Sequence, residues 1–176
     1  MHINKLKKYY FINEFNYNHL INLNKNISFI WRNKDKETPK ETIIKLRDFC
    51  KKNQRCFYIS NDIKLATKIN ADGVYISSSN QNLNLKTLNL KKKFRILGSA
   101  HNLKEIKIKE LQQTEEILLS PLFKKKTKQQ LNIYRYLKLR ATTKMNDISL
   151  GGINNKNLKK LNMIKPFGFA GISFFE

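Results

Sequence analysis

Short apolar runs in this chain are followed by residues that could bind anions or metal ions. Arg32 and Lys34 follow the run at 27–31, and their spacing of two allows both cations to point toward one diphosphate. Asn61 and Asp62 follow the next run and offer an amide and a carboxylate, ligands that suit Mg2+ beside a substrate phosphate. A solvated basic turn explains the first pair equally well, and ordinary helix capping explains the second.

Two further segments carry groups for acid–base chemistry or for covering a phosphate. The stretch Gly98-Ser99-Ala100-His101-Asn102 places a hydroxyl and an imidazole after an apolar run. Because imidazole exchanges protons near neutral pH, His101 could act as an acid or a base, and a capping or packing role is equally open. The loop at 120–128 is basic, includes Thr127 and Lys128, and is long enough to cover a phosphate, although charge runs are usually solvated surface.

Glycines and a serine after the last two runs predict a phosphate-binding cup. The chain has Gly151-Gly152-Ile153-Asn154 after one run and Gly171-Ile172-Ser173 after the next. Glycine N–H groups can approach an anion closely, and barrels of parallel strands often bind phosphate after their seventh and eighth strands. We therefore assign Gly151, Gly152 and Ser173 to phosphate binding, with a simple turn as the alternative for the glycine pair.

These groups meet only if the runs are parallel strands whose carboxyl ends share one edge. Short apolar runs alternate with longer amphipathic stretches, with eight runs in all, which indicates repeated strand–helix units and a parallel sheet. The expected strands are residues 9–13, 27–31, 56–60, 73–77, 94–98, 116–120, 147–151 and 168–173. The expected helices are residues 18–23, 40–52, 63–69, 85–91, 103–111, 130–144 and 156–163.

Eight such units predict an α/β fold of the (β/α)8 TIM-barrel class, trimmed in size and forming one domain over residues 1–176. The sequence stops soon after the eighth expected strand, so the last helix of a full barrel is expected to be missing. That would leave the outside of the first and last strands open, either for a homodimer contact or because this chain end is not the natural one. The alternative, an open doubly wound sheet, is opposed by the missing glycine-rich dinucleotide motif and by polar residues after almost every strand.

The composition is that of a strongly basic chain with a globular share of apolar residues. Its formal net charge is +22, but the lysines are scattered through every expected helix, so nucleic-acid binding is disfavoured. No stretch approaches the roughly 18 apolar residues of a membrane span, and the first residues lack the pattern of a signal peptide. We therefore expect a cytoplasmic location, no membrane contact and small phosphorylated molecules as partners.

Several segments, taken in order, resemble the thiamine phosphate synthase/TenI family over nearly the whole chain. They are Phe57-Tyr58-Ile59-Ser60-Asn61-Asp62 with Ala71-Asp72-Gly73-Val74-Tyr75-Ile76, Ile96-Leu97-Gly98-Ser99-Ala100-His101-Asn102, Ser120-Pro121-Leu122-Phe123 with Thr127-Lys128, and Leu150-Gly151-Gly152-Ile153. They are similar to the family's Asn-Asp and Ala-Asp-Gly-Val segments, its Gly-x-Ser-x-His-Asn segment, its Gly-Pro-Ile-Phe and Thr-Lys loop, and its Gly-Gly-Ile turn. Each segment is weak alone, and their shared order makes the resemblance specific.

The resemblance implies a transferase of thiamine biosynthesis that uses Mg2+. In the family's reaction, thiazole phosphate attacks the methylene of hydroxymethylpyrimidine diphosphate, and magnesium helps diphosphate to leave. The residues implied to bind the substrates are Arg32, Lys34, Asn61, Thr127, Gly151, Gly152 and Ser173, those implied to bind the metal are Asp62 and Asn80, and those implied in catalysis are Lys128, Ser99 and His101.

Three departures from the family pattern keep two other functions open. Ile30 stands where the family has glutamine, Tyr75 stands where histidine is common, and Asn80 replaces the second metal-binding aspartate. A neutral amide should bind magnesium more weakly than a carboxylate does. The alternatives are a metal-free, TenI-like thiazole tautomerase that uses His101 for proton transfer, and a phosphate-binding barrel without catalysis.

Overall fold

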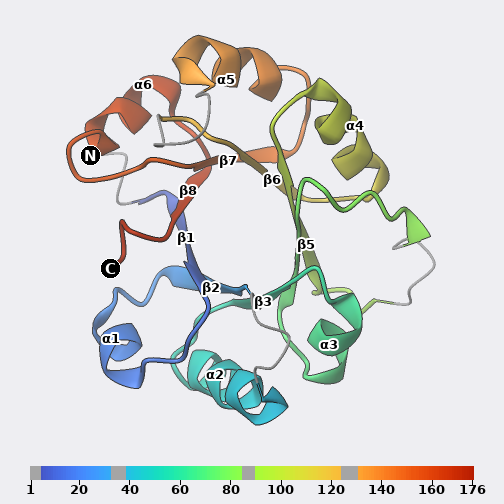
Figure 1. Ribbon diagram of the computed structural model, residues 1–176, viewed down its shortest axis with the longest axis vertical. Helices are drawn as coiled ribbons and strands as arrows, with labels where there is room; N and C mark the ends of the chain where they lie inside the picture. Colours follow the sequence, from blue (N-terminus) through green and yellow to red (C-terminus); the bar gives the residue numbers. More distant parts are fainter. Residues whose placement is uncertain (1–4, 33–38, 85–89, 124–130) are drawn as a thin grey trace.

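Eight parallel strands close into a barrel in chain order, as the sequence predicts (Figure 1). The structure is a computed structural model that describes residues 5–32, 39–84, 90–123 and 131–176. The strands are β1 (Lys7–Ile12), β2 (Ile27–Trp31), β3 (Phe57–Ser60), β4 (Gly73–Ile76), β5 (Arg95–Ala100), β6 (Glu116–Leu119), β7 (Asn146–Leu150) and β8 (Gly168–Gly171). β2 has the expected bounds, and the ends of the other strands differ from expectation by one or two residues.

Alternate residues of each strand face the two sides of the barrel wall. The interior holds a cluster of buried apolar residues: Tyr9, Phe11, Ile30, Tyr58, Tyr75, Leu97, Leu118, Ile148 and Ala170. The intervening residues, such as Phe29, Phe57 and Ile117, belong to a second, larger cluster between the sheet and the helices. Because both faces are buried, the strands read in the sequence as continuous apolar runs.

The amino ends of the strands are held by a charged cluster around Glu116. This carboxylate is buried, and it accepts hydrogen bonds from Tyr9 Oη at 2.5 Å and from Lys7 Nζ at 2.6 Å, with Arg95 Nη1 3.7 Å away. A buried carboxylate needs such partners, because an unpaired buried charge is strongly destabilising. This end of the barrel therefore serves stability, as is usual for the amino ends of TIM-barrel strands.

Short helices surround the barrel (Figure 1). They are α1 (Tyr17–Asn22), α2 (Lys40–Lys52), α3 (Ile63–Lys68), α4 (Leu103–Leu111), α5 (Asn132–Arg140), the 3-10 turn η3 (Leu158–Lys160) and α6 (Leu161–Ile164). Among the helices of these described ranges, none combines the length and the apolar character needed to cross a bilayer.

Three predicted helices need correction. α5 is shorter than the predicted 130–144, because Thr142 Oγ1 bonds to Leu139 O at 2.7 Å and ends it in a turn. Residues 156–163 form η3 and the start of α6, because Asn154 Oδ1 accepts the N–H of Asn157 at 3.1 Å and holds a turn there. Of the helix predicted at 85–91, residues 85–89 lie outside the described part, and the remaining two are not helical.

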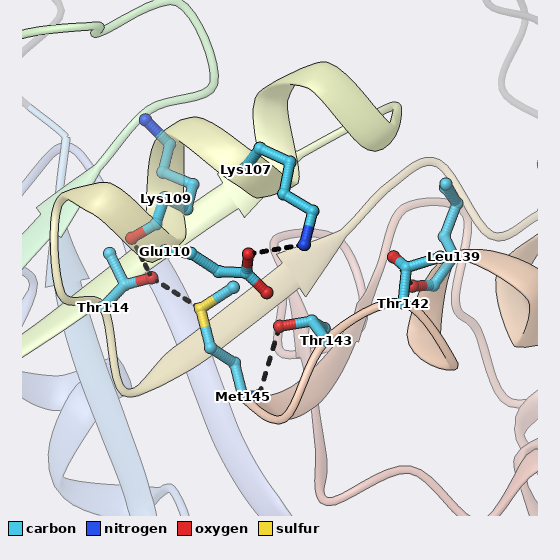
Figure 2. A network of polar contacts seen from close by, with 8 residues as sticks. All are labelled: Lys107, Lys109, Glu110, Thr114, Leu139, Thr142, Thr143 and Met145. Atoms are coloured by element: carbon cyan, nitrogen blue, oxygen red, sulfur yellow. Dashed lines mark hydrogen bonds and ion pairs between the residues drawn. The ribbon is translucent and has the colours of Figure 1, made fainter.

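Polar contacts join the end of α4 to the segment before β7 (Figure 2). Thr114 Oγ1 lies 3.1 Å from Lys109 O and 2.8 Å from Met145 Sδ. On the exposed side of the helix, Lys107 Nζ donates to Glu110 Oε2 at 2.8 Å, and this hydrogen bond lowers the pKa of Glu110. These contacts fix the last turn of α4, from which the side chain of Lys109 extends.

Two aromatic residues cover the outside of β1 and β8, where the sequence predicts an open face. Phe175 is buried, and its ring centroid lies 5.2 Å from that of Tyr10 and 5.9 Å from that of Phe169. Phe174 packs edge-on against Phe169 with a centroid distance of 5.1 Å. The expectation of an open face is therefore wrong, because the turn after β8 folds back and buries Tyr10 and Phe169.

Candidate active site

A cavity of about 450 Å3 opens at the carboxyl ends of the strands. Seven of the residues that the sequence assigns to the site line it: Arg32, Asn61, Ser99, His101, Gly151, Gly152 and Ser173. They lie at or just beyond the ends of β2, β3, β5, β7 and β8, so closure of the barrel brings them together. The edge at which they meet is the one where TIM barrels carry their active sites.

The loop after β7 offers bare backbone to the cavity. Gly151 and Gly152 have φ values of 98° and 71°, in the region that side chains rarely adopt. A Cβ atom on Gly152 would lie 2.8 Å from Phe123 O, so the neighbouring loop leaves no room for one. Asn157 Nδ2 donates to Gly152 O at 2.7 Å and holds the loop in place. A side chain at Gly152 would therefore be strained, and its absence suits close approach of an anion to the backbone.

Arg32 supplies a cation directly after β2. Its N–H donates to Ile12 O at 2.8 Å, which fixes the backbone at the rim of the cavity. Its guanidinium lies over the ring of Phe11, 5.5 Å from the centroid. Within the described residues, no carboxylate forms a salt bridge with Arg32. Its donors are therefore available to an anion, and the aromatic ring supports the planar group from one side.

Ser99 and Tyr75 form the floor of the cavity. Tyr75 Oη donates to Ser99 Oγ at 2.9 Å, and both residues are buried. The ring of Phe11 packs edge-on against Tyr75, 5.1 Å between centroids. Burial raises the pKa of Tyr75, so its phenol stays a donor at neutral pH. Since the phenol donates its proton to Ser99, the hydroxyl proton of Ser99 remains available for a ligand.

His101 is held by the loop that follows β6. Its Nδ1 lies 2.7 Å from Ser120 O and 3.2 Å from Ser120 Oγ. A carbonyl oxygen can only accept, so the neutral imidazole carries its proton on Nδ1 and leaves Nε2 as an acceptor. The backbone N–H of His101 donates to Glu105 Oε2 at 2.7 Å, which anchors the segment to α4. This arrangement gives a fixed ring with one nitrogen able to take a proton.

The neighbours Asn61 and Asp62 make different contacts: Asn61 lines the cavity, whereas Asp62 caps a helix. Asn61 has a φ of 58°, and its Oδ1 accepts the N–H of Ser77 at 2.9 Å beside the cavity. Asp62 is the N-cap of α3, where its Oδ1 accepts the N–H of Leu65 at 2.8 Å. Asp62 is exposed and does not line the cavity, so the capping alternative describes its observed contact.

Asp62 is the one carboxylate that the sequence assigns to a magnesium site. Asn80 also lies off the cavity lining, and its Oδ1 already accepts the N–H of Asn82 at 3.0 Å. Across the ranges that the structure describes, no three His, Cys, Asp or Glu side chains form a group that could bind a metal by themselves. Mg2+ often takes only one or two carboxylates and completes its shell with water and substrate phosphate, so a site at Asp62, which caps α3 off the cavity lining, would need a bound phosphate to complete it.

Three predicted site residues lie outside the described residues: Lys34, Thr127 and Lys128. Conversely, the cavity is also lined by Ser77 and Ser78, which the sequence analysis does not assign to the site. The signal for them exists in the sequence, because a run of three serines follows the fourth strand at its carboxyl end. Tyr75 is a further lining residue whose bond to Ser99 only the structure reveals.

The family model and the sequence relatives that match this chain belong to one family. A family model described as thiamine monophosphate synthase matches residues 23–175. A thiamine-phosphate synthase of Prochlorococcus marinus is 31% identical over 136 residues, which cover 72% of this chain but only 38% of that protein. A thiamine-phosphate synthase of Hydrogenobaculum sp. is 26% identical over 153 residues, 84% of this chain and 70% of that one.

The fold itself is shared with a solved structure. A thiamine phosphate pyrophosphorylase from Pyrococcus furiosus superposes with a TM-score of 0.74 at 17% sequence identity. The match covers 97% of this chain and 87% of the other. At this identity the likeness concerns the barrel architecture, and the assignment of chemistry depends on the residues that line the cavity.

Proposed function

This chain belongs to the thiamine monophosphate synthase family, and we propose that it joins hydroxymethylpyrimidine diphosphate to thiazole phosphate with release of diphosphate. The supporting observation is that one cavity is lined both by a cation, Arg32, and by the glycine cup of Gly151 and Gly152. The cation suits the leaving diphosphate, and the cup suits the phosphate of the nucleophile. Thiamine biosynthesis is the setting that the family implies.

The proposed reaction is a displacement that needs no covalent enzyme intermediate. The thiazole nitrogen forms a bond to the pyrimidine methylene carbon while the bond from that carbon to the diphosphate oxygen breaks. Negative charge then grows on the leaving diphosphate, where Arg32 and the Ser99 hydroxyl can donate hydrogen bonds. Lys34, Thr127 and Lys128, which lie outside the described residues, are proposed to add further contacts there.

We assign a magnesium ion to the same end of the substrate. Asp62 would hold it, with the amide of Asn80 as a weaker second donor. When bound, the ion supplies additional positive charge to the leaving diphosphate. Asn61, on the cavity lining between Asp62 and β3, orients this edge through its bond to Ser77.

A coupling assay with both phosphorylated substrates tests the proposal. We expect magnesium-dependent formation of thiamine phosphate, lowered at least 100-fold in Arg32→Ala and abolished in Lys128→Ala. The matched control is Lys138→Ala, at an exposed lysine of α5 that does not line the cavity, and this variant should keep the wild-type rate. A wild-type protein that makes no product at saturating substrate and magnesium would overturn the synthase assignment.

One observation favours a second function, a thiazole tautomerase. The tie of His101 Nδ1 to Ser120 O leaves Nε2 as a base on the cavity lining, which is what proton transfer on a thiazole ring would use. Such an enzyme should isomerise the thiazole carboxylate phosphate without metal and lose that activity in His101→Ala. A rate unchanged by His101→Ala would exclude this function.

If neither reaction occurs, the remaining function for the glycine cup is phosphate binding without catalysis. Crystals soaked in inorganic phosphate should then show an anion at Gly152 and Ser173. An empty cup at saturating phosphate would argue against every function that needs this site.

A further inference from the structure

Two buried polar side chains at the end of α4 hold the loop that follows β4. Lys109 has no exposed surface, and its Nζ donates to Asn80 O at 2.7 Å and to Gln112 Oε1 at 2.8 Å. Gln112 is equally buried, and its Nε2 donates to Asn80 O at 3.1 Å and to Asn82 O at 2.9 Å. Three of these four hydrogen bonds end on backbone carbonyls of residues 80–82.

Burial of the Lys109 ammonium group costs its hydration, and only the hydrogen bonds that it makes in the fold offset this cost. Within the described part of the chain, no carboxylate lies within salt-bridge distance of its ammonium group. Burial lowers the pKa of Lys109 to about 8, against a weaker opposing attraction from Glu105. An apolar side chain would fill the same space without this desolvation cost. The contacts to the loop are therefore the distinctive property of a lysine at this position.

The path of Lys109 is built into the barrel wall. A Cβ atom on Gly98 would lie 2.9 Å from Lys109 Cδ and 2.9 Å from Thr114 Cγ2. Glycine at this point of β5 therefore leaves the space that the alkyl chain of Lys109 crosses. The next residue of the strand is Ser99, on the floor of the cavity. The same strand thus carries the site on one face and accommodates Lys109 on the other.

The loop that these side chains hold is one wall of the cavity. Ser77 and Ser78 line the cavity, and the N–H of Asn80 donates to Ser77 O at 3.1 Å to close a turn. On the cavity side, Asn61 Oδ1 accepts the N–H of Ser77 at 2.9 Å and lies 3.4 Å from Asn80 Nδ2. The turn is thus fixed from the cavity by Asn61 and from behind by Lys109 and Gln112.

We propose that Lys109 and Gln112 are positioning residues that hold residues 77–82 as the wall of the active site and so set its affinity for the diphosphate group. Neither side chain touches the cavity, so both act through the backbone of Asn80 and Asn82. The link to affinity rests on the proposed function, whereas the restraint on the loop does not.

The test compares Lys109→Met and Gln112→Leu with Lys104→Met, a variant of an exposed lysine in the first turn of the same helix. Backbone hydrogen exchange reports the loop, and titration calorimetry with inorganic diphosphate reports the site independently of turnover. We expect the hydrogen-bonded amides of Ser77, Asn80 and Asn82 to exchange at least tenfold faster in the first two variants, with amides of β6 unchanged. The dissociation constant for diphosphate, and the KM for the pyrimidine diphosphate in an active enzyme, should rise about fivefold with kcat altered less than twofold.

A third variant keeps the test informative if Lys109→Met does not fold. Gln112→Glu retains an acceptor for Lys109 but removes both Nε2 donors, so it should speed exchange of the same amides by a smaller factor. Exchange that stays at the wild-type rate in all folded variants would overturn the proposal, as would faster exchange throughout the barrel or unchanged diphosphate affinity. A wild-type protein that binds diphosphate without making product would overturn the synthase assignment and leave this proposal standing.

Discussion

The contacts of Tyr75 change how its departure from the family pattern is interpreted. In the sequence it is a departure from the family's histidine, but in the barrel its phenol donates to Ser99 while Phe11 packs against its ring. Both arrangements place a hydrogen-bonding group at the end of β4, so the substitution preserves polarity at the floor of the cavity. The larger and buried phenol has a fixed donor role, because burial raises its pKa and keeps it protonated.

Tyr75→Phe tests that role without changing the shape of the floor. Ser99 would lose the donor that now orients it, and a lost hydrogen bond of this kind costs about 1 kcal/mol. We expect kcat/KM for the coupling reaction to fall about fivefold, with the melting temperature changed by no more than a few degrees. Tyr134→Phe is the matched control, because Tyr134 is 76% exposed on α5. Equal activity of the two variants would contradict the role of Tyr75.

Gly152→Ala tests the backbone conformation of the phosphate cup. The φ of 71° and the 2.8 Å approach of the new Cβ to Phe123 O should together cost about 1–3 kcal/mol in the free energy of unfolding. Gly171→Ala is the control, because its nearest atom would be Phe174 Cβ at 3.3 Å and its φ is not in the positive region. Urea unfolding of both variants measures the difference. A Gly152→Ala protein as stable as Gly171→Ala would show that the loop adapts easily.

The strand ends explain which site residues could be predicted. Because the strands are parallel and buried on both faces, a polar residue just after a run lies at the carboxyl edge, which locates Arg32 and Asn61. The same logic does not separate Asn61 from Asp62, since the positive φ of Asn61 decides which of them faces the cavity. Lys109 could not be found at all, because in a chain with 35 Lys and Arg residues the alternating Ile and Lys at 106–109 do not show whether Lys107 or Lys109 is the buried lysine.

At the scale of elements, the strands are predictable and the covering segments are not. Each strand is specified by its own apolar run, whereas the short helices depend on side chains that end them, such as Thr142 after α5. The cover over β1 and β8 comes from two phenylalanines in a turn, for which no periodic pattern exists. Their role is recognised only in the closed barrel, where they pack against the outside of β1 and β8.

Phe175→Ala tests how much this cover contributes. Phe175 is buried against Tyr10 and Phe169, and truncation of a buried phenylalanine typically costs 3–5 kcal/mol. We expect about 3 kcal/mol less stability by chemical denaturation, the lower end of this range, because the residue lies in a turn whose surroundings can relax. Met163→Ala, at a residue that is 71% exposed on α6, should change stability by less than about 0.5 kcal/mol. Similar values for both variants would mean that the aromatic cover is dispensable.

The whole molecule combines a high positive charge with an interior rich in tyrosine. The sequence has a net charge of +22, and among the described residues the buried charged side chains are hydrogen-bonded, as Glu116 is with Lys7 and Tyr9. Tyr9 and Tyr58 face each other inside the barrel, 5.9 Å between ring centroids, and Tyr136 lies buried outside β7 beside Asp147. Burial raises the pKa of all three phenols, and in Tyr136 the charge of Asp147 adds to the effect.

These raised pKa values predict a loss of stability at alkaline pH. Below about pH 10 the phenols are protonated in both the folded and the unfolded chain, so their contribution to stability is complete. Above that pH the unfolded chain releases protons that the folded chain retains, so the free energy of unfolding falls by about 1.4 kcal/mol per pH unit for each phenol. Urea unfolding between pH 9 and 11 should therefore show a steep decline. In Tyr136→Phe the total decline between pH 9 and 11 should be smaller by about 1.4 kcal/mol, and an unchanged decline would show that Tyr136 ionises equally in both states.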